Sequence, residues 1–201
     1  YKEIDGDFKS IIRLFPKHQF TLAWQRVDQQ GVGSYDHLTQ RGYQLYQSDP
    51  QQRQLAYIRW DHTDHSPWMK KLRVSLSGQY MNELRHSQKA EDPLRREEQD
   101  EVNTLGAVLE YHAQPKANWN ILSGIDLYRD EVASLGLTIH TIDSTNTSGR
   151  GRFSDGATST SDSFFSLHRL EWINLNLTGG IRYTFIQVST FEPEFGRVDV
   201  T

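Results

Sequence analysis

The sequence contains no cysteine among its 201 residues, which excludes a structural disulfide and a metal site built on thiolates. No stretch approaches the ~18 consecutive apolar residues that a membrane helix requires. The mean hydropathy is −0.70 and the formal charge is −4. No basic run of the kind that binds nucleic acid is present, so neither a helical membrane protein nor a nucleic-acid-binding protein is predicted. A membrane β-barrel is not excluded, because its strands need an apolar residue only at every second position.

Four short turns alternate with three long polar segments along the chain. Three of the turns carry a proline, at Pro16, Pro67 and Pro115, which are 51 and 48 residues apart, and the fourth turn is Ile173-Asn174-Leu175. The long segments cover residues 29–52, 84–100 and 130–161, and we expect them to be loops. Short turns at one end of a sheet and long loops at the other are typical of an outer-membrane β-barrel.

Hydrophobic residues alternate with polar ones on both sides of each short turn, which is the period of a β-strand. The clearest example is in residues 69–83, where Leu72, Val74 and Leu76 alternate with Arg73, Ser75 and Ser77. A strand that crosses a bilayer needs ~9–11 residues when tilted. We predict an all-β fold: an up-and-down antiparallel segment of about eight strands from a larger transmembrane β-barrel, forming one partial barrel domain over residues 1–201. The strands are expected at residues 8–14, 20–25, 53–63, 69–83, 101–113, 118–129, 162–172 and 175–190.

The aromatic residues support a membrane interpretation of this sheet. Of the five tryptophans, all but Trp24 lie within a few residues of a short turn, and membrane barrels carry aromatic girdles at both interfaces. Tyr80 and Tyr128 lie toward the long-loop ends, where an outer girdle is expected. The polar face of each strand would equally suit the wet outside of a soluble sheet. What lies behind the apolar face, a protein core or lipid, decides between the two.

Three segments toward the end of the chain carry recognisable motifs: Phe153-Ser154-Asp155-Gly156, then Glu171-Trp172, then LNLTGGIRY at residues 175–183. They resemble TonB-dependent outer-membrane receptors. In that family a long loop ends in an F-x-D-G turn, a strand leads to an E-W short turn, and the next strand reads L-x-L-x-x-G-x-R-Y. The resemblance implies a barrel of about twenty-two strands closed by a plug domain. We expect the chain, which runs from Tyr1 to Thr201, to be a fragment cut at both ends, without that plug.

The resemblance implies a receptor that takes up a scarce nutrient, such as a ferric siderophore, haem or a vitamin. Its expected partners are outer-membrane lipid, an extracellular small ligand and TonB, which would act through the missing plug. A complete eight-stranded barrel, a porin-like channel and a barrel enzyme of the same membrane are alternatives, as is a soluble, lectin-like all-β binding module. A β-sandwich of that kind would need apolar residues matched in two facing sheets.

Candidate ligand-binding residues lie in or beside the long polar segments. The candidates for contacting haem or an iron complex at the mouth of the barrel are Tyr35 together with His37, and also His140. Arg150 and Arg152 form a basic loop tip that suits an anionic ligand or lipopolysaccharide. The eight histidines lack the spacing of a metal site, and no Ser/His/Asp set or carboxylate pair is evident. The sequence therefore predicts a non-enzymatic protein without a resident metal or cofactor.

Overall fold

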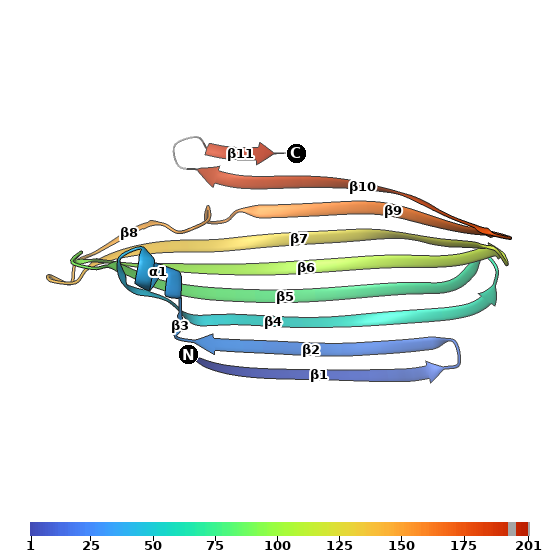
Figure 1. Cartoon of the computed structure of the whole chain (residues 1–201), viewed down its shortest axis with the longest axis horizontal. Helices are drawn as coiled ribbons and strands as arrows, with labels where there is room; N and C mark the ends of the chain where they lie inside the picture. Colours follow the sequence, from blue (N-terminus) through green and yellow to red (C-terminus); the bar gives the residue numbers. More distant parts are fainter. Residues whose placement is uncertain (193–195, 201) are drawn as a thin grey trace.

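The computed structural model describes residues 1–192 and 196–200, and eight long strands in four hairpins make up most of them (Figure 1). Within these residues one short helix, α1 (Tyr35–Gln40), is present, and no helix has the length and apolar content to cross a membrane. The short strands are β3 (Val32–Gly33), β8 (Asn146–Arg150) and β11 (Gly196–Val200). The long strands are β1 (Lys2–Phe15), β2 (His18–Gln30), β4 (Tyr43–Ser66), β5 (Met69–Lys89), β6 (Leu94–Lys116), β7 (Trp119–His140), β9 (Thr158–Trp172) and β10 (Leu175–Glu192).

All strands belong to one antiparallel sheet with the order β1-β2-β4-β5-β6-β7-β9-β10-β11, while β3 pairs with β4 and β8 with β7. The sheet is open, with β1 and β11 at its two edges (Figure 1). Each long hairpin has a two-residue turn, at residues 16–17, 67–68, 117–118 and 173–174. These turns lie at one end of the sheet, here called the turn end, and the other connections lie at the opposite, loop end (Figure 1). The predicted all-β, up-and-down fold with eight main strands is confirmed.

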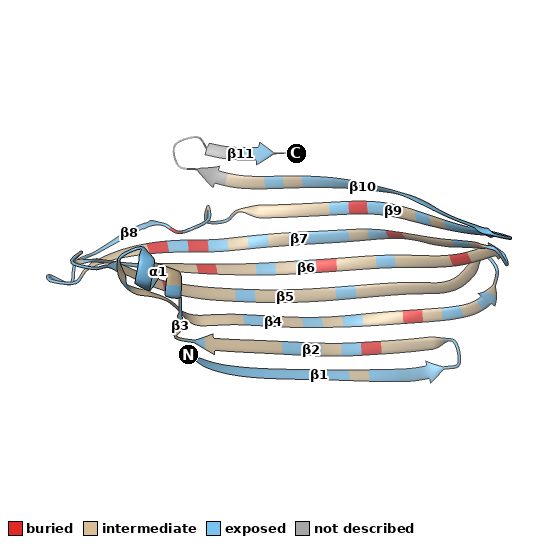
Figure 2. Cartoon of the chain, in the orientation of Figure 1, coloured by how far each residue is buried: buried red, intermediate tan, exposed pale blue. Residues whose placement is uncertain are grey.

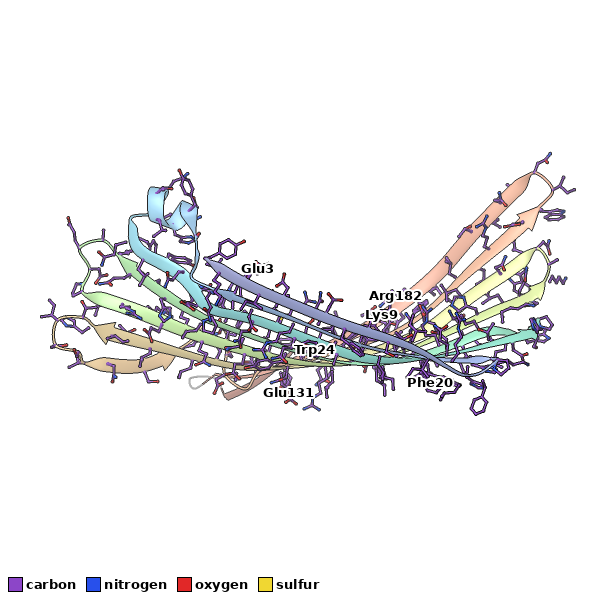
Figure 3. The ribbon with its side chains drawn as sticks, turned by 90° about the horizontal axis from the view of Figure 1, so that it is seen from below. Glu3, Lys9, Phe20, Trp24, Glu131 and Arg182 are labelled. Carbon is purple, nitrogen blue, oxygen red and sulfur yellow. The ribbon has the colours of Figure 1, made fainter. Side chains whose placement is uncertain are left out.

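The strand register sorts the side chains of the sheet into an apolar and a polar face. One cross-strand row contains Leu22, Ile58, Leu76, Ala107 and Leu127. Residues paired across an antiparallel sheet share a face, and neighbours along a strand lie on opposite faces, so this row is apolar from β2 to β7. Figure 3 shows Phe20 and Trp24 on one side of the sheet, and Lys9 and Arg182 on the other.

No second layer covers either face of the sheet among the described residues. Large apolar side chains of the apolar face are exposed, with Leu76 at 52%, Leu105 at 67% and Ile181 at 68%. The buried side chains are instead mostly polar and scattered over the sheet, as Figure 2 shows. Ala113 is the one buried apolar side chain in the part of the chain whose burial is described. The structure therefore lacks the interior of a two-sheet sandwich, whose two inner faces interdigitate.

Aromatic rings lie against glycines on the polar face. A Cβ added to Gly106 would lie 2.7 Å from the ring of Tyr128, and one added to Gly124 would lie 2.5 Å from the ring of Phe165. The register pairs Gly106 with Tyr128 and Gly124 with Phe165, so each ring covers the backbone of the glycine opposite it on the neighbouring strand. The prediction that Tyr128 contributes to an outer aromatic girdle is therefore wrong, because its ring lies on the polar face.

The three predicted long loops are mostly strand, which corrects the sequence prediction. β4 already begins at Tyr43, β5 and β6 leave only residues 90–93 between them, and β7 continues to His140. With 24 residues, β4 is far longer than the ~9–11 residues that cross a bilayer. The segment at 130–161 likewise contains β8 and the start of β9.

Charged and polar side chains contact one another within and between the strands of these extensions. On one face, Arg95 donates to Glu97 at 2.5 Å, and His86 Nδ1 lies 3.2 Å from the same carboxylate. On the opposite face, Arg85 contacts Glu83 and Glu98, each at 3.4 Å. Both faces are thus polar in this part of the sheet, so the hydrophobic alternation that identifies a strand in the sequence disappears although the pairing continues.

Candidate ligand-binding surface at the loop end

A shift of register in β4 brings an aromatic side chain onto the polar face at the loop end. Below the shift, Gln51 pairs with Glu83, and above it Ser48 pairs with Arg85. Two residues of β4, at positions 49 and 50, are therefore opposed by the single residue Leu84 of β5, as in a β-bulge, and the alternation of faces in β4 changes. As a result Tyr46, which pairs with Ser87, lies on the same face as Arg85 and Glu83.

Three aromatic rings and two cations form a cluster on this part of the polar face. The rings are His37 of α1 and Tyr43 and Tyr46 of β4, and the cations are Arg85 and Lys89 of β5; together they are called the mouth cluster. The His37 ring stacks on Tyr46 with the ring centres 3.7 Å apart, and Tyr43 meets both rings edge-on at 5.5 and 5.2 Å. The Arg85 guanidinium and the Lys89 ammonium each lie 6.0 Å from a tyrosine ring centre. Such rings and cations together suit an aromatic or anionic ligand.

The sequence around α1 explains how His37 reaches this position. Gly31 and Gly42, on either side of the segment, adopt φ values of +64° and +71°, which favour glycine. Ser34 precedes the helix, and its hydroxyl lies 2.8 Å from His37 Nδ1, which fixes the orientation of the ring. Tyr35, in contrast, is 78% exposed. Of the two candidates predicted on this segment, His37 belongs to the mouth cluster and Tyr35 lies in solvent beside it.

The remaining predicted residues lie on the β7–β9 connection. His140 ends β7, and its Nδ1 is 3.0 Å from the carboxylate of Asp143. The Thr145 hydroxyl and backbone N–H donate to Asp143 at 2.7 and 3.0 Å, and these bonds lower the pKa of Asp143 below its ordinary value. The exposed Arg150 donates to the Ser154 hydroxyl at 3.1 Å, and Arg152 lies over the ring of Phe153.

The F-x-D-G segment attaches this connection to the sheet. The Asp155 carboxylate accepts the backbone N–H of Ser134 at 3.0 Å, and the Ser134 hydroxyl accepts the N–H of Phe153 at 3.1 Å. The same hydroxyl donates to the buried Asp100 at 2.5 Å. A Cβ on Gly151 would lie 2.3 Å from the Ser134 oxygen, so the close approach requires glycine. The motif therefore fixes the position of Arg150 and Arg152 relative to β7.

The five predicted residues thus form two groups rather than one site. α1 packs on β4, whereas His140, Arg150 and Arg152 belong to the β7–β9 connection, and strands β5 and β6 lie between the two (Figure 1). The sequence analysis missed Tyr43, Tyr46 and Arg85, since the bulge that aligns them is not visible in the hydrophobic pattern. In the described part of the chain, no three His, Cys, Asp or Glu side chains gather in the arrangement of a metal site.

The sheet is thus two-faced, single-layered, up-and-down and not closed. Among solved structures, the chain is similar to the copper transporter OprC, with a TM-score of 0.75 and 16% sequence identity. The match covers 94% of this chain and 29% of that chain, so the chain spans less than a third of the length of OprC. No family model and no curated protein matches the sequence. At this identity the comparison shows a shared fold.

Proposed function

We propose that the chain forms part of the wall of an outer-membrane transporter. The observation that supports this most strongly is the uncovered apolar face, on which rows such as Leu22, Ile58 and Leu76 are exposed over the middle of the sheet. In water such a face would be costly, at about 25 cal/mol per Å² of apolar surface. In a bilayer it meets lipid, while the polar face lines the interior of the barrel.

We further propose that the transporter captures a scarce ligand from outside and takes it up with energy supplied through TonB. The resemblance of the Phe153–Gly156 and Glu171-Trp172 segments to TonB-dependent receptors supports this role. The ligand would be a ferric siderophore, haem or a similar compound, and the role is transport rather than catalysis. The mouth cluster, on the polar face at the loop end, is the part of the chain best suited to first contact.

A porin-like channel and a soluble binding module are the competing functions. A porin would have no plug domain, so the sequence upstream of Tyr1 in the intact gene product separates it from a receptor. A soluble module would bury the apolar face against a second sheet, and the purified protein would then need no detergent.

The membrane role is tested by expressing the chain with its native flanking sequence and following where it partitions. The proposal predicts extraction by detergent from the membrane fraction, and a change in gel mobility on boiling, as for a closed barrel. Recovery in the soluble fraction without a heat-dependent shift would reject the transporter role and favour the soluble module.

The ligand is tested with the full-length transporter in cells that depend on it for iron or copper. Ferric siderophores, haem and Cu²⁺ are supplied in turn, with and without functional TonB. The proposal predicts TonB-dependent uptake of one iron compound, reduced by His37→Ala and by Tyr46→Leu. The control is His168→Ala, since His168 is near the turn end and hydrogen-bonds Trp119. Uptake independent of TonB would favour a porin.

A further inference from the structure

A basic hollow lies on the polar face near the turn end, away from the mouth cluster. It has a volume of about 320 Å³ and is formed by β1, β2, the β1–β2 turn, β4 and β5. Five basic side chains line it, and the one carboxylate in its lining is Asp61. The basic residues are Arg13, Lys17, Arg59, Lys71 and Arg73.

Asp61 is shared by three of these cations. Its side chain is 7% exposed, and it lies 3.1 Å from Arg59 Nε, 3.1 Å from Lys71 Nζ and 2.9 Å from Arg73 Nε. Arg73 has a second carboxylate partner, Glu110, at 2.9 Å. Arg59 and Lys71 therefore share the single negative charge of Asp61, which cannot neutralise both of them.

The other two cations do not restore the balance. Lys17 is paired with Asp64 at the rim, at 2.7 Å. Arg13 donates its Nε–H to the amide oxygen of Gln19 at 3.2 Å, a neutral partner. Even when Glu110 and Asp64 are included, five cations face three carboxylates. The hollow carries an excess of positive charge.

This excess lies in a wall whose other face is apolar, since Ile58 and Trp60 flank Arg59 on the opposite face of β4. Charges near apolar surroundings are screened less than in bulk water, so repulsion among the cations and attraction for an anion are both strengthened. Planar guanidinium groups bind carboxylate and phosphate through paired N–H donors. We propose that the hollow binds an oxyanion, a carboxylate or a phosphate group, in the interior of the barrel near its turn end.

The anion has two sources that the same experiment separates: free phosphate, or an acidic side chain of the plug domain, a source that rests on the proposed function. The test variant is Arg13→Gln with Lys71→Gln, which removes two cations but leaves Asp61 its contacts with Arg59 and Arg73. The matched control is Arg53→Gln, because Arg53 lies on the same face of β4, outside the hollow, and also donates to a glutamine, Gln79.

The melting temperature of the full-length protein in detergent is measured against inorganic phosphate, with chloride at matched ionic strength as reference. A ligand that binds only the folded state raises this temperature in a saturable manner. Free-anion binding predicts such a rise, with the half-saturating phosphate concentration at least tenfold higher in the double variant and unchanged in Arg53→Gln.

An internal carboxylate predicts no phosphate effect, a lower melting temperature for the double variant than for Arg53→Gln, and an Asp or Glu side chain in the hollow in a structure of the intact protein. The proposal is overturned if phosphate has no effect and the double variant melts at or above the control. It is equally overturned if the double variant melts lower but the structure shows no carboxylate there. These outcomes are independent of the transported ligand.

Discussion

Glycines of the polar face are fitted closely to the aromatic rings and backbone of the next strands. At Gly124 a Cβ would meet the Phe165 ring at 2.5 Å and the Leu109 carbonyl oxygen at 2.6 Å, whereas at Gly179, on the apolar face, nothing lies within 4 Å. We predict that Gly124→Ala lowers the free energy of unfolding by about 1–3 kcal/mol, the usual cost of overpacking. Gly179→Ala is expected to change it by less than about 0.5 kcal/mol.

Urea unfolding of the full-length protein in detergent micelles measures both glycine variants. Because the two glycines differ in their surroundings and not in residue type, equal effects of the two substitutions would contradict the packing described for the polar face.

Ser134 is the residue on which the F-x-D-G segment is anchored. Ser134→Ala removes the donor to Asp100 and the acceptor of the Phe153 N–H. Leaving such groups unsatisfied costs about 1–3 kcal/mol, so we predict local opening of residues 151–157. Trypsin cleaves after arginine, so this opening is measured as faster tryptic cleavage at the exposed Arg150 and Arg152. Ser123→Ala is the control, because its hydroxyl pairs with Ser166 elsewhere on the sheet; equally fast cleavage in both variants would contradict the anchor.

Long strands that extend far beyond a bilayer are the main property of this fold at the scale of elements. Residues 84–89 and 94–100 continue β5 and β6 as paired strands. We predict that their amides exchange slowly with deuterium in the full-length protein, because they are hydrogen-bonded in the sheet. The amides of Ile142 and Asp143, in the exposed turn between β7 and β8, are expected to exchange fast. Fast exchange of the amides throughout residues 84–100 would contradict these strands and would support the loop that the sequence pattern predicted.

The sequence predicted the strands where one face is apolar and failed where both faces are polar. In residues 72–80 the alternation of apolar and polar side chains identifies both the strand and its faces. In residues 85–89 and 94–98 the backbone pairing continues while both faces carry charged residues, which in sequence are indistinguishable from a solvated loop. Four short turns were predicted from proline and from the paired strands around Ile173; the third turn is at residues 117–118, whereas Pro115, which was expected to lie in it, belongs to β6.

The candidate site was predicted only in part for a related reason. His37 was recognised as a candidate, but the position of Tyr46 depends on the bulge at residues 49–50 of β4, and that of Tyr43 on a second register shift between Tyr43 and Leu45. A bulge inserts one residue and reverses the faces beyond it, and no feature of the hydrophobic pattern reveals it. The basic hollow likewise depends on cross-strand neighbours, since Arg13, Asp61 and Arg73 are far apart in the chain but lie in one row of the sheet.

The described residues form one open sheet whose two faces differ in polarity. Its polar face carries the basic hollow at the turn end and the mouth cluster at the loop end, while its apolar face is uncovered between them. This arrangement is the one expected for part of a larger barrel, in agreement with the match to 29% of the length of OprC. The central claim is that lipid covers the apolar face.

The most direct test is a nitroxide scan of residues 71–81 of β5 in the full-length protein, reconstituted in liposomes. The 201 residues contain no cysteine, so a single cysteine introduced into β5 has no competing site among them, and any cysteine elsewhere in the full-length protein is first replaced by serine. The account predicts that labels at Leu72, Val74, Leu76 and Gly78 are accessible to oxygen dissolved in lipid, while labels at Arg73, Ser75 and Ser77 are accessible to a water-soluble nickel complex. Low accessibility of the even-numbered positions to oxygen, as in a protein core, would contradict it.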